Sequence, residues 1–143
     1  MGTELNDVYD LQRFVDAQEP MFEEVREELR DGSKTSHWMW FIFPQINGLG
    51  HSAKARKYAI SSLEGATAYL EHPVLGPRLR DCTHIVNMVE GRTAHQIFGH
   101  PDDLKFHSSM TLFAEATLGN AIFKDVLQKY YGGEPDRLTL EKL

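Results

Sequence analysis

The stretch from Pro73 to Glu90 carries its apolar residues on one helical face. They recur at intervals of one, three or four positions: Leu75, Leu79, Cys82, Ile85, Val86 and Val89. An α-helix completes a turn about every 3.6 residues, so this spacing predicts an amphipathic helix that packs one side against a core. Gly91 then supplies a stop for the helix. Cys82 lies within the apolar stripe, which predicts a small buried core residue rather than a nucleophile.

Helical spacing also covers most of the remaining chain. It predicts further helices at about residues 11–18, 21–29, 37–43, 52–60, 62–71, 102–117 and 120–130, and a short turn at residues 94–98. No segment alternates apolar and polar residues over four or more positions, as a half-buried strand would. We therefore predict an all-α fold, a compact single-domain bundle of about seven helices with no substantial sheet. The domain spans residues 1–143, with residues 1–9 as a disordered N-terminal tail.

The most apolar of these segments runs from His37 to Phe43, with the sequence His-Trp-Met-Trp-Phe-Ile-Phe. Trp, Phe and Ile also favour strands. Thr35 and Ser36 are candidate N-caps and Pro44 ends the run, which favours a short helix. A helix of this composition cannot point every side chain at one core, because the apolar residues cover its full circumference. Some of them must line a pocket, an interface or a second core layer.

The charge of the chain is unevenly distributed. The formal net charge is −6, which argues against a nucleic-acid partner. Residues 1–31 hold ten acidic residues against three arginines, a net of −7. Residues 32–63 contain no Asp or Glu and carry +4, from Lys34, Lys54, Arg56 and Lys57. This acid-free segment either binds an anion or is a chance cluster of charges on a solvated face.

A glycine loop lies inside the acid-free segment. Gly48-Leu-Gly-His-Ser-Ala53 matches the loose dinucleotide fingerprint G-x-G-x-x-A, but that fingerprint acts only directly after a strand, and no strand is predicted here. The same loop, entering a helix at Ser52, would offer free backbone N–H groups and a positive dipole end to an anion. Lys54 and Arg56 stand in the first turns, where cations oppose the helix dipole. They either serve a bound anion or point into water.

A second polar patch is predicted within residues 102–111. On a helix, Lys105, Ser108 and Ser109 share one face, and the buried side is formed by Phe106, Met110 and Phe113. A lysine with two hydroxyl groups on one patch suits a phosphate or a carboxylate. The same composition also describes an ordinary solvated helix edge.

Several function classes have no support in the sequence. A single cysteine excludes an internal disulfide and thioredoxin-type chemistry, and it fits a reducing compartment. The first residues contain no apolar run for a signal peptide or a membrane span, so we expect a soluble cytoplasmic protein with no membrane partner. The seven histidines lack metal-ligand spacing, and neither a nucleophile elbow nor a phosphate-binding loop is present. We expect no metal and no cofactor.

The longer motifs of the chain resemble those of the DUF1810 family. They are His37 to Gln45, Gly48-Leu-Gly50, Tyr69 to Leu79, Ile97-Phe-Gly99 and Ser108 to Phe113. The resemblance implies an all-helical bacterial and fungal domain whose biochemical function is not established. Some members carry the label calpastatin, but inhibitors of that type are disordered, whereas this chain has the composition of a compact core. A fainter similarity, to NADAR-type proteins that process ADP-ribose derivatives, rests on size, helical class and scattered Trp, Lys, Asp and Gln residues.

These observations lead to two hypotheses on function. In the first, a helical pocket binds a phosphate-bearing small molecule such as an ADP-ribose-like nucleotide; whether it also hydrolyses the ligand, as an enzyme would, stays open. The expected binding residues are Trp38, Trp40, Gln45, Ser52, Lys54, Arg56, Lys105, Ser108 and Ser109, and the acid–base candidates are His37 and Asp102. In the second, the Trp- and Phe-rich run is an exposed hot spot that binds a protein partner, without catalytic activity. The aromatics line a concavity with basic residues in the first hypothesis and form a flat patch in the second; a third interpretation is that all of them are core.

Overall fold

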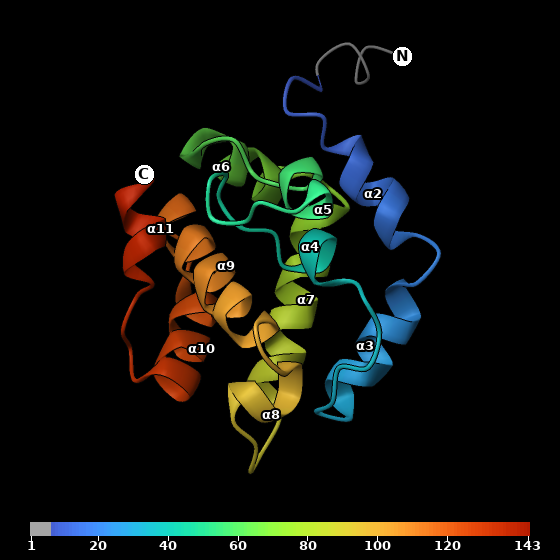
Figure 1. Cartoon of the computed structure of the whole chain (residues 1–143), viewed down its shortest axis with the longest axis vertical. Helices are drawn as coiled ribbons and strands as arrows, with labels where there is room; N and C mark the ends of the chain where they lie inside the picture. Colours follow the sequence, from blue (N-terminus) through green and yellow to red (C-terminus); the bar gives the residue numbers. More distant parts are fainter. Residues whose placement is uncertain (1–6) are drawn as a thin grey trace.

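The computed structural model describes residues 7–143, and the regular structure in this part of the chain is α-helical (Figure 1). In chain order the helices are α2 (Gln12–Gln18), α3 (Phe22–Arg30), α4 (Met39–Ile42), α5 (Ala53–Lys57), α6 (Leu63–Glu71), α7 (Leu75–Met88), α8 (Ala94–Phe98), α9 (Asp102–Ala116), α10 (Ala121–Tyr131) and α11 (Arg137–Glu141). One isolated parallel bridge joins Ile46 to Ile60. The predicted all-α fold is confirmed. The helices outnumber the expected seven or so because four of them have only four or five residues.

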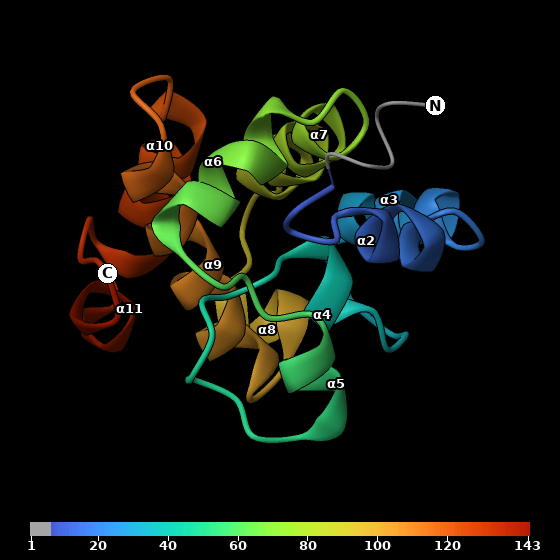
Figure 2. The same ribbon diagram turned by 90° about the horizontal axis from the view of Figure 1, so that it is seen from above.

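The helices form a bundle around α7 and α9. Helix α7 packs against α3, α6 and α10, and α9 packs against α6, α8, α10 and α11. In Figure 1, α2 and α3 lie on one side of the molecule and α10 and α11 on the other, with α6 and α7 between them. Seen from above in Figure 2, α4 and α5 lie together on a face away from α6 and α7. Among the described residues, no helix has both the length and the apolar character that a membrane crossing requires.

Helix α9 is buried around most of its circumference. Nine of its fifteen residues are buried, and these include the predicted buried side of Phe106, Met110 and Phe113. The sequence pattern places Ser109 with Lys105 on a solvated face, but Ser109 has no exposed surface. The reason is that α9 has helices on several sides, so a second face is covered as well. Ser109 is therefore not available to a ligand in this structure.

The start of the described chain packs against the bundle. The Asp7 carboxylate accepts hydrogen bonds from the backbone N–H groups of Leu11 and Gln12, and Tyr9 packs against the core. Of the tail expected at residues 1–9, residues 1–6 lie outside the described residues. The remaining three residues are held by these contacts, so the described chain is anchored from Asp7 onward.

Cys82 is buried in α7, as its place on the apolar stripe predicts. Burial raises the pKa of its thiol to about 12, and the thiolate is the form that attacks thiol reagents. We expect the native protein to react with an aromatic disulfide reagent only as fast as the fold opens, and the denatured protein to react at the rate of a free thiol. Rapid labelling of the native protein at mildly alkaline pH would contradict the buried position.

Candidate functional site

A buried carboxylate holds the loop between α3 and α4. Glu28 Oε1 accepts hydrogen bonds from the backbone N–H groups of Thr35 (2.8 Å) and Ser36 (3.0 Å) and from the indole N–H of Trp38 (3.0 Å), and its Oε2 accepts one from the Ser36 hydroxyl (2.7 Å). Burial acts to raise the pKa of Glu28, but these four hydrogen bonds outweigh it and lower the pKa from 4.5 to about 2. Thr35 and Ser36 are thus partners of Glu28 and not the predicted N-caps. The residue before α4 is Trp38, whose side chain makes no capping bond.

Most of the aromatic run is part of the core. Trp38, Met39, Ile42 and Phe43 are at most 2% exposed, and Phe41 is 7% exposed. Trp38, which we expected to stack on a ligand, is fully buried and donates its indole N–H to Glu28, so it presents no surface to a ligand. With these residues buried, the run does not form the exposed aromatic patch that the interaction-module hypothesis requires.

Trp40 differs from its neighbours because it is only partly buried. Its indole nitrogen is inaccessible and has no hydrogen-bond partner among the described residues. The ammonium groups of Lys54 and Lys105 lie 5.0 Å and 5.1 Å from the centre of its ring, within the range of cation–π attraction. Two positively charged groups therefore lie beside the ring that carries the unpartnered indole N–H.

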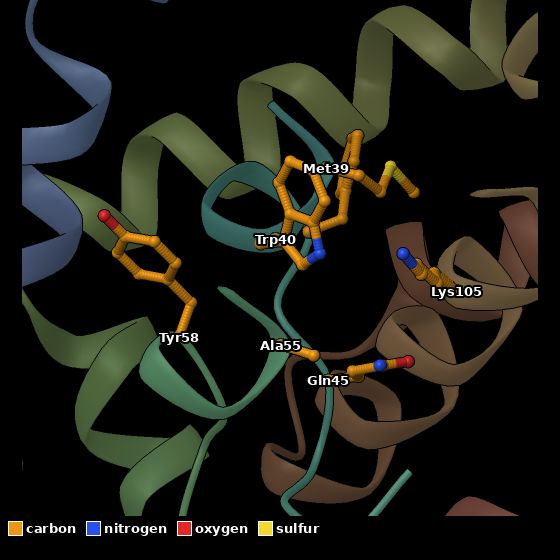
Figure 3. A pocket seen from close by; sticks show the side chains of 7 residues that line it. Met39, Trp40, Gln45, Ala55, Tyr58 and Lys105 are labelled. Atoms are coloured by element: carbon orange, nitrogen blue, oxygen red, sulfur yellow. The ribbon is translucent and has the colours of Figure 1, made fainter. Parts of the chain in front are cut away.

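A small cavity, here called the inner cavity, lies beside Trp40. The side chains that line it are Met39, Trp40, Phe43, Gln45, Ala55, Tyr58 and Lys105. Figure 3 shows the indole nitrogen of Trp40 on the side that faces Lys105 and Gln45. The volume is about 10 Å³, which holds about one water molecule. The inner cavity is thus a nearly closed space lined by nitrogen donors from α4, α9 and the loop after α4.

A larger space, here called the outer groove, lies next to the inner cavity. It is formed by the loop after α4, by the first turns of α9 and by the start of α11, through Gln45, Leu49, Gly50, Pro101, Leu104, Lys105, His107, Ser108, Asp136 and Leu138. Its volume is about 410 Å³, within the range of small-molecule sites, about 300–1,000 Å³. Gln45 and Lys105 line both spaces. The two spaces therefore adjoin at these two side chains, and together they are here called the cleft.

Asp102, an acid–base candidate, lies between two lysines at the start of α9. Its Oδ2 is 2.7 Å from Nζ of Lys34, and its Oδ1 is 3.7 Å from Nζ of Lys105. The Lys34 side chain is only 7% exposed, and its Nζ also lies 5.1 Å from the ring centre of Trp38. The ion pair with Lys34 ties the loop before α4 to α9. The weaker pair holds Lys105 next to Trp40.

The remaining predicted residues lie partly in the cleft and partly away from it. Ser108 lines the outer groove, where its Oγ is 2.8 Å from Asp136 Oδ2. Ser52 is the N-cap of α5, and its hydroxyl oxygen already accepts a backbone N–H of that helix. His37 and Arg56 are exposed and line neither the inner cavity nor the outer groove. The structure thus brings Trp40, Gln45, Lys54, Lys105 and Ser108 together, with Asp102 beside them.

The cleft also contains residues that the sequence analysis did not select. Tyr58 lines the inner cavity, and His107 and Asp136 line the outer groove. The His107 ring stacks on Tyr131 with centroids 4.0 Å apart, and its Nε2 lies 2.7 Å from a backbone carbonyl oxygen, that of Glu134. The sequence does indicate one role for Asp136, because an aspartate directly before a short helix is a typical N-cap, and Asp136 caps α11. Nothing in the sequence pattern indicated that this cap faces α9.

Comparison with known proteins finds relatives but no activity. A family model described as a protein of unknown function, DUF1810, matches residues 8–143. The crystal structure of the conserved hypothetical protein Rv1873 from Mycobacterium tuberculosis is similar, with 59% sequence identity, a TM-score of 0.95, and coverage of 96% of this chain and 98% of that one. No curated protein matches. These comparisons assign no activity, so the function is inferred from the chemistry of the cleft.

Proposed function

The chain belongs to the DUF1810 family, and we propose that its cleft binds a phosphate-bearing small molecule, such as an ADP-ribose-like nucleotide. The observation that carries this proposal is the Trp40 indole N–H, which is buried without a partner among the described residues, on a ring that has the ammonium groups of Lys54 and Lys105 beside it. A phosphate supplies the oxygen acceptors that this arrangement lacks. The single buried thiol suits a reducing compartment, and we place the protein in the cytoplasm.

The energetics of the three donors favour an anion. A buried donor without a partner costs about 1–3 kcal/mol, which a bound oxygen acceptor would recover. Two ammonium groups lie about 5 Å from the centre of one ring, and the described carboxylate next to Lys105, Asp102, is already paired more closely with Lys34. An anion beside Trp40 would accept the indole N–H and would be attracted by both ammonium groups.

The inner cavity must widen to take a phosphate. Its volume of about 10 Å³ is too small for one. Lys105 lines both the inner cavity and the outer groove, and its long, flexible side chain is 23% exposed. A shift of the Lys105 side chain toward the groove would join the two spaces, with the phosphate beside Trp40 and the rest of the ligand in the groove.

The two acid–base candidates differ in their distance from this site. Neither residue lines the inner cavity or the outer groove. Asp102 is paired at 3.7 Å with Lys105, which lines both spaces, whereas His37 is exposed. An acid–base group must come within hydrogen-bond reach of the reacting atoms. Asp102 is therefore the better candidate for a general acid or base if the ligand is hydrolysed. The function that we propose for the cleft is ligand binding alone.

Substitution of Lys105 by alanine tests the proposal. We expect the dissociation constant for ADP-ribose to rise about tenfold or more, because a charge-assisted contact is lost. The melting temperature should fall by at most about 2 °C, because Asp102 keeps its ion pair with Lys34. Binding is measured from the indole N–H signals of the two tryptophans in a nitrogen-15 NMR spectrum. Trp40 should shift on titration, and Trp38, bonded to Glu28, should not.

Lys124→Ala is the matched control for Lys105→Ala. Lys124 is an exposed lysine of α10, outside the cleft, so its removal changes the net charge equally. It should leave the dissociation constant unchanged within about twofold. A wild-type protein whose Trp40 signal ignores both ADP-ribose and inorganic phosphate would overturn the proposal.

A further inference from the structure

The outer groove changes its chemical character along α9. Lys105 stands at its inner end, beside Trp40, and Ser108 follows one helical turn later. There the Ser108 Oγ contacts the Asp136 carboxylate at 2.8 Å, so the groove carries a cation at one end and an anion at the other. A phosphate is attracted to the first end and repelled from the second. The groove therefore orients any ligand that has one anionic end.

We propose that the outer groove holds a polyhydroxylated ring, such as the ribose of a nucleotide, with Asp136 accepting hydrogen bonds from its hydroxyl groups. This inference rests on the proposed binding of a phosphate beside Trp40. It adds the chemical class of the second part of the ligand: a sugar phosphate or nucleotide in preference to inorganic phosphate or an alkyl phosphate.

The Asp136 carboxylate is held in place by one of its oxygens. Oδ2 lies 2.8 Å from the Ser108 hydroxyl, 3.2 Å from the backbone N–H of Thr139 and 2.6 Å from the Thr139 hydroxyl. Oδ1 takes part in none of these contacts. A carboxylate has about four acceptor positions on its two oxygens. Asp136 lines the groove with a carboxylate whose position is fixed, and Oδ1 is left to accept a hydrogen bond from a sugar hydroxyl.

A second acceptor lies in the same wall. The Nε2 of His107 lies 2.7 Å from the Glu134 carbonyl oxygen, so this nitrogen carries the hydrogen and donates it. In the neutral imidazole, Nδ1 is then the acceptor. Stacking on Tyr131 at 4.0 Å, with the planes 8° apart, fixes the orientation of the ring. Asp136 and His107, two side chains of fixed orientation that line one groove, suit a ligand with more than one hydroxyl group.

The remaining lining suits the apolar face of a ring. Leu104 and Leu138 are 55% and 60% exposed, and both line the groove together with Leu49 and Pro101. Sugar rings present C–H groups on their faces and hydroxyl groups at their edges. A ring lying on these side chains with its edge toward Asp136 would use both kinds of surface.

Three phosphate probes test this inference by the shift of the Trp40 indole signal: inorganic phosphate, n-butyl phosphate and ribose 5-phosphate. In the wild-type protein we expect ribose 5-phosphate to bind about tenfold more tightly than the other two, as a hydrogen bond to a charged acceptor provides. In Asp136→Asn this preference should fall to within about threefold, while the affinity for inorganic phosphate is unchanged or slightly higher, because a negative charge has been removed.

The outcomes separate this inference from the proposed function. If none of the three probes shifts the Trp40 signal, this inference is overturned, and the proposed function fails as well when ADP-ribose also leaves the signal unchanged. If all three bind the wild-type protein equally, phosphate binding stands and sugar recognition is overturned. A preference for ribose 5-phosphate that survives in Asp136→Asn would overturn the role of Asp136. Asparagine also caps helices well, so α11 should stay folded. The comparison of probes in the wild-type protein does not depend on the variant.

Discussion

Replacement of Gly76 by alanine should lower the free energy of unfolding by about 3 kcal/mol and the melting temperature by about 10 °C. Gly76 is the second residue of α7, and the backbone carbonyl of Leu70, near the end of α6, occupies the space where a Cβ would stand. The clash of the new methyl group with this carbonyl can be removed only if α6 and α7 move apart. Both helices are held by further contacts, because α6 also packs on α9 and α7 also packs on α3 and α10. Alanine favours a helix over glycine by about 1 kcal/mol. Because helix propensity alone would make the variant more stable, a net loss of stability can be attributed to the clash between α6 and α7.

Gly119→Ala is the matched control for this substitution. Gly119 lies between α9 and α10, and a methyl group there would be 3.8 Å from Thr117 Oγ1, an ordinary contact. We expect this variant to stay within about 0.5 kcal/mol of the wild type, or to gain slightly because the unfolded chain loses freedom. Urea denaturation of both variants measures the difference. Equal stabilities would show that α6 and α7 have room for a methyl group.

The helices that could be predicted from the sequence are those that bury one face. Helix α7 shows this directly, because its apolar stripe predicted residues 73–90 and the helix spans Leu75–Met88. Helix α4 is shorter than the predicted 37–43. Thr35 and Ser36, which were expected to cap it, donate hydrogen bonds to the Glu28 carboxylate instead. Helix α9 was predicted in extent but not in burial. A second covered face depends on helices that follow it in the chain, which local spacing does not reveal.

The candidate site could be predicted in part because it comes from two segments whose composition is unusual. The acid-free segment supplies Trp40, Gln45 and Lys54, and α9 supplies Lys105 and Ser108. The structure brings these five residues together but leaves His37, Arg56 and the buried Trp38 and Ser109 outside the lining of the cleft, and a role in binding stays a proposal. The choice between the two tryptophans could not be predicted. In a segment that is apolar all round, only the tertiary contacts decide which indole is buried.

The residues that were missed share a different property. Glu28, Lys34 and Asp136 act through partners that are distant in the sequence or that belong to another element: Trp38 for Glu28, Asp102 for Lys34 and Ser108 for Asp136. Each looks like an ordinary charged surface residue when read alone. Their importance arises from burial and from their partners in the fold, and neither can be inferred from the composition of the sequence or the spacing of its residues.

Among these residues, Glu28 should have the largest effect on stability. The glutamate-to-glutamine substitution at this position should lower the free energy of unfolding at neutral pH by about 3 kcal/mol, the equivalent of a pKa lowered from 4.5 to about 2. Glutamine keeps the size of the side chain and one oxygen acceptor, but it loses the charge that three N–H groups and the Ser36 hydroxyl stabilise. The fold should therefore persist with a weaker loop between α3 and α4.

The pH dependence distinguishes this charge effect from a loss of packing. A carboxylate whose pKa is lowered in the folded state contributes its full stability above the unfolded pKa of about 4.5, and the contribution is lost as the pH falls toward about 2. The wild type and Glu28→Gln should therefore differ most at neutral pH, and the gap should shrink by about 2 kcal/mol by about pH 3. Other carboxylates titrate in both proteins and cancel in the comparison.

Glu27→Gln provides the control for Glu28→Gln at the adjacent position. Glu27 is exposed on α3, so its substitution should change the free energy of unfolding by at most about 0.5 kcal/mol. Urea denaturation of the three proteins across the acidic range measures all of these differences. A gap between wild type and Glu28→Gln that stays constant with pH would show that the carboxylate stabilises the loop by its shape and not by its charge. Because the same loop leads into α4, the variant should also weaken the response of the Trp40 indole signal to phosphate.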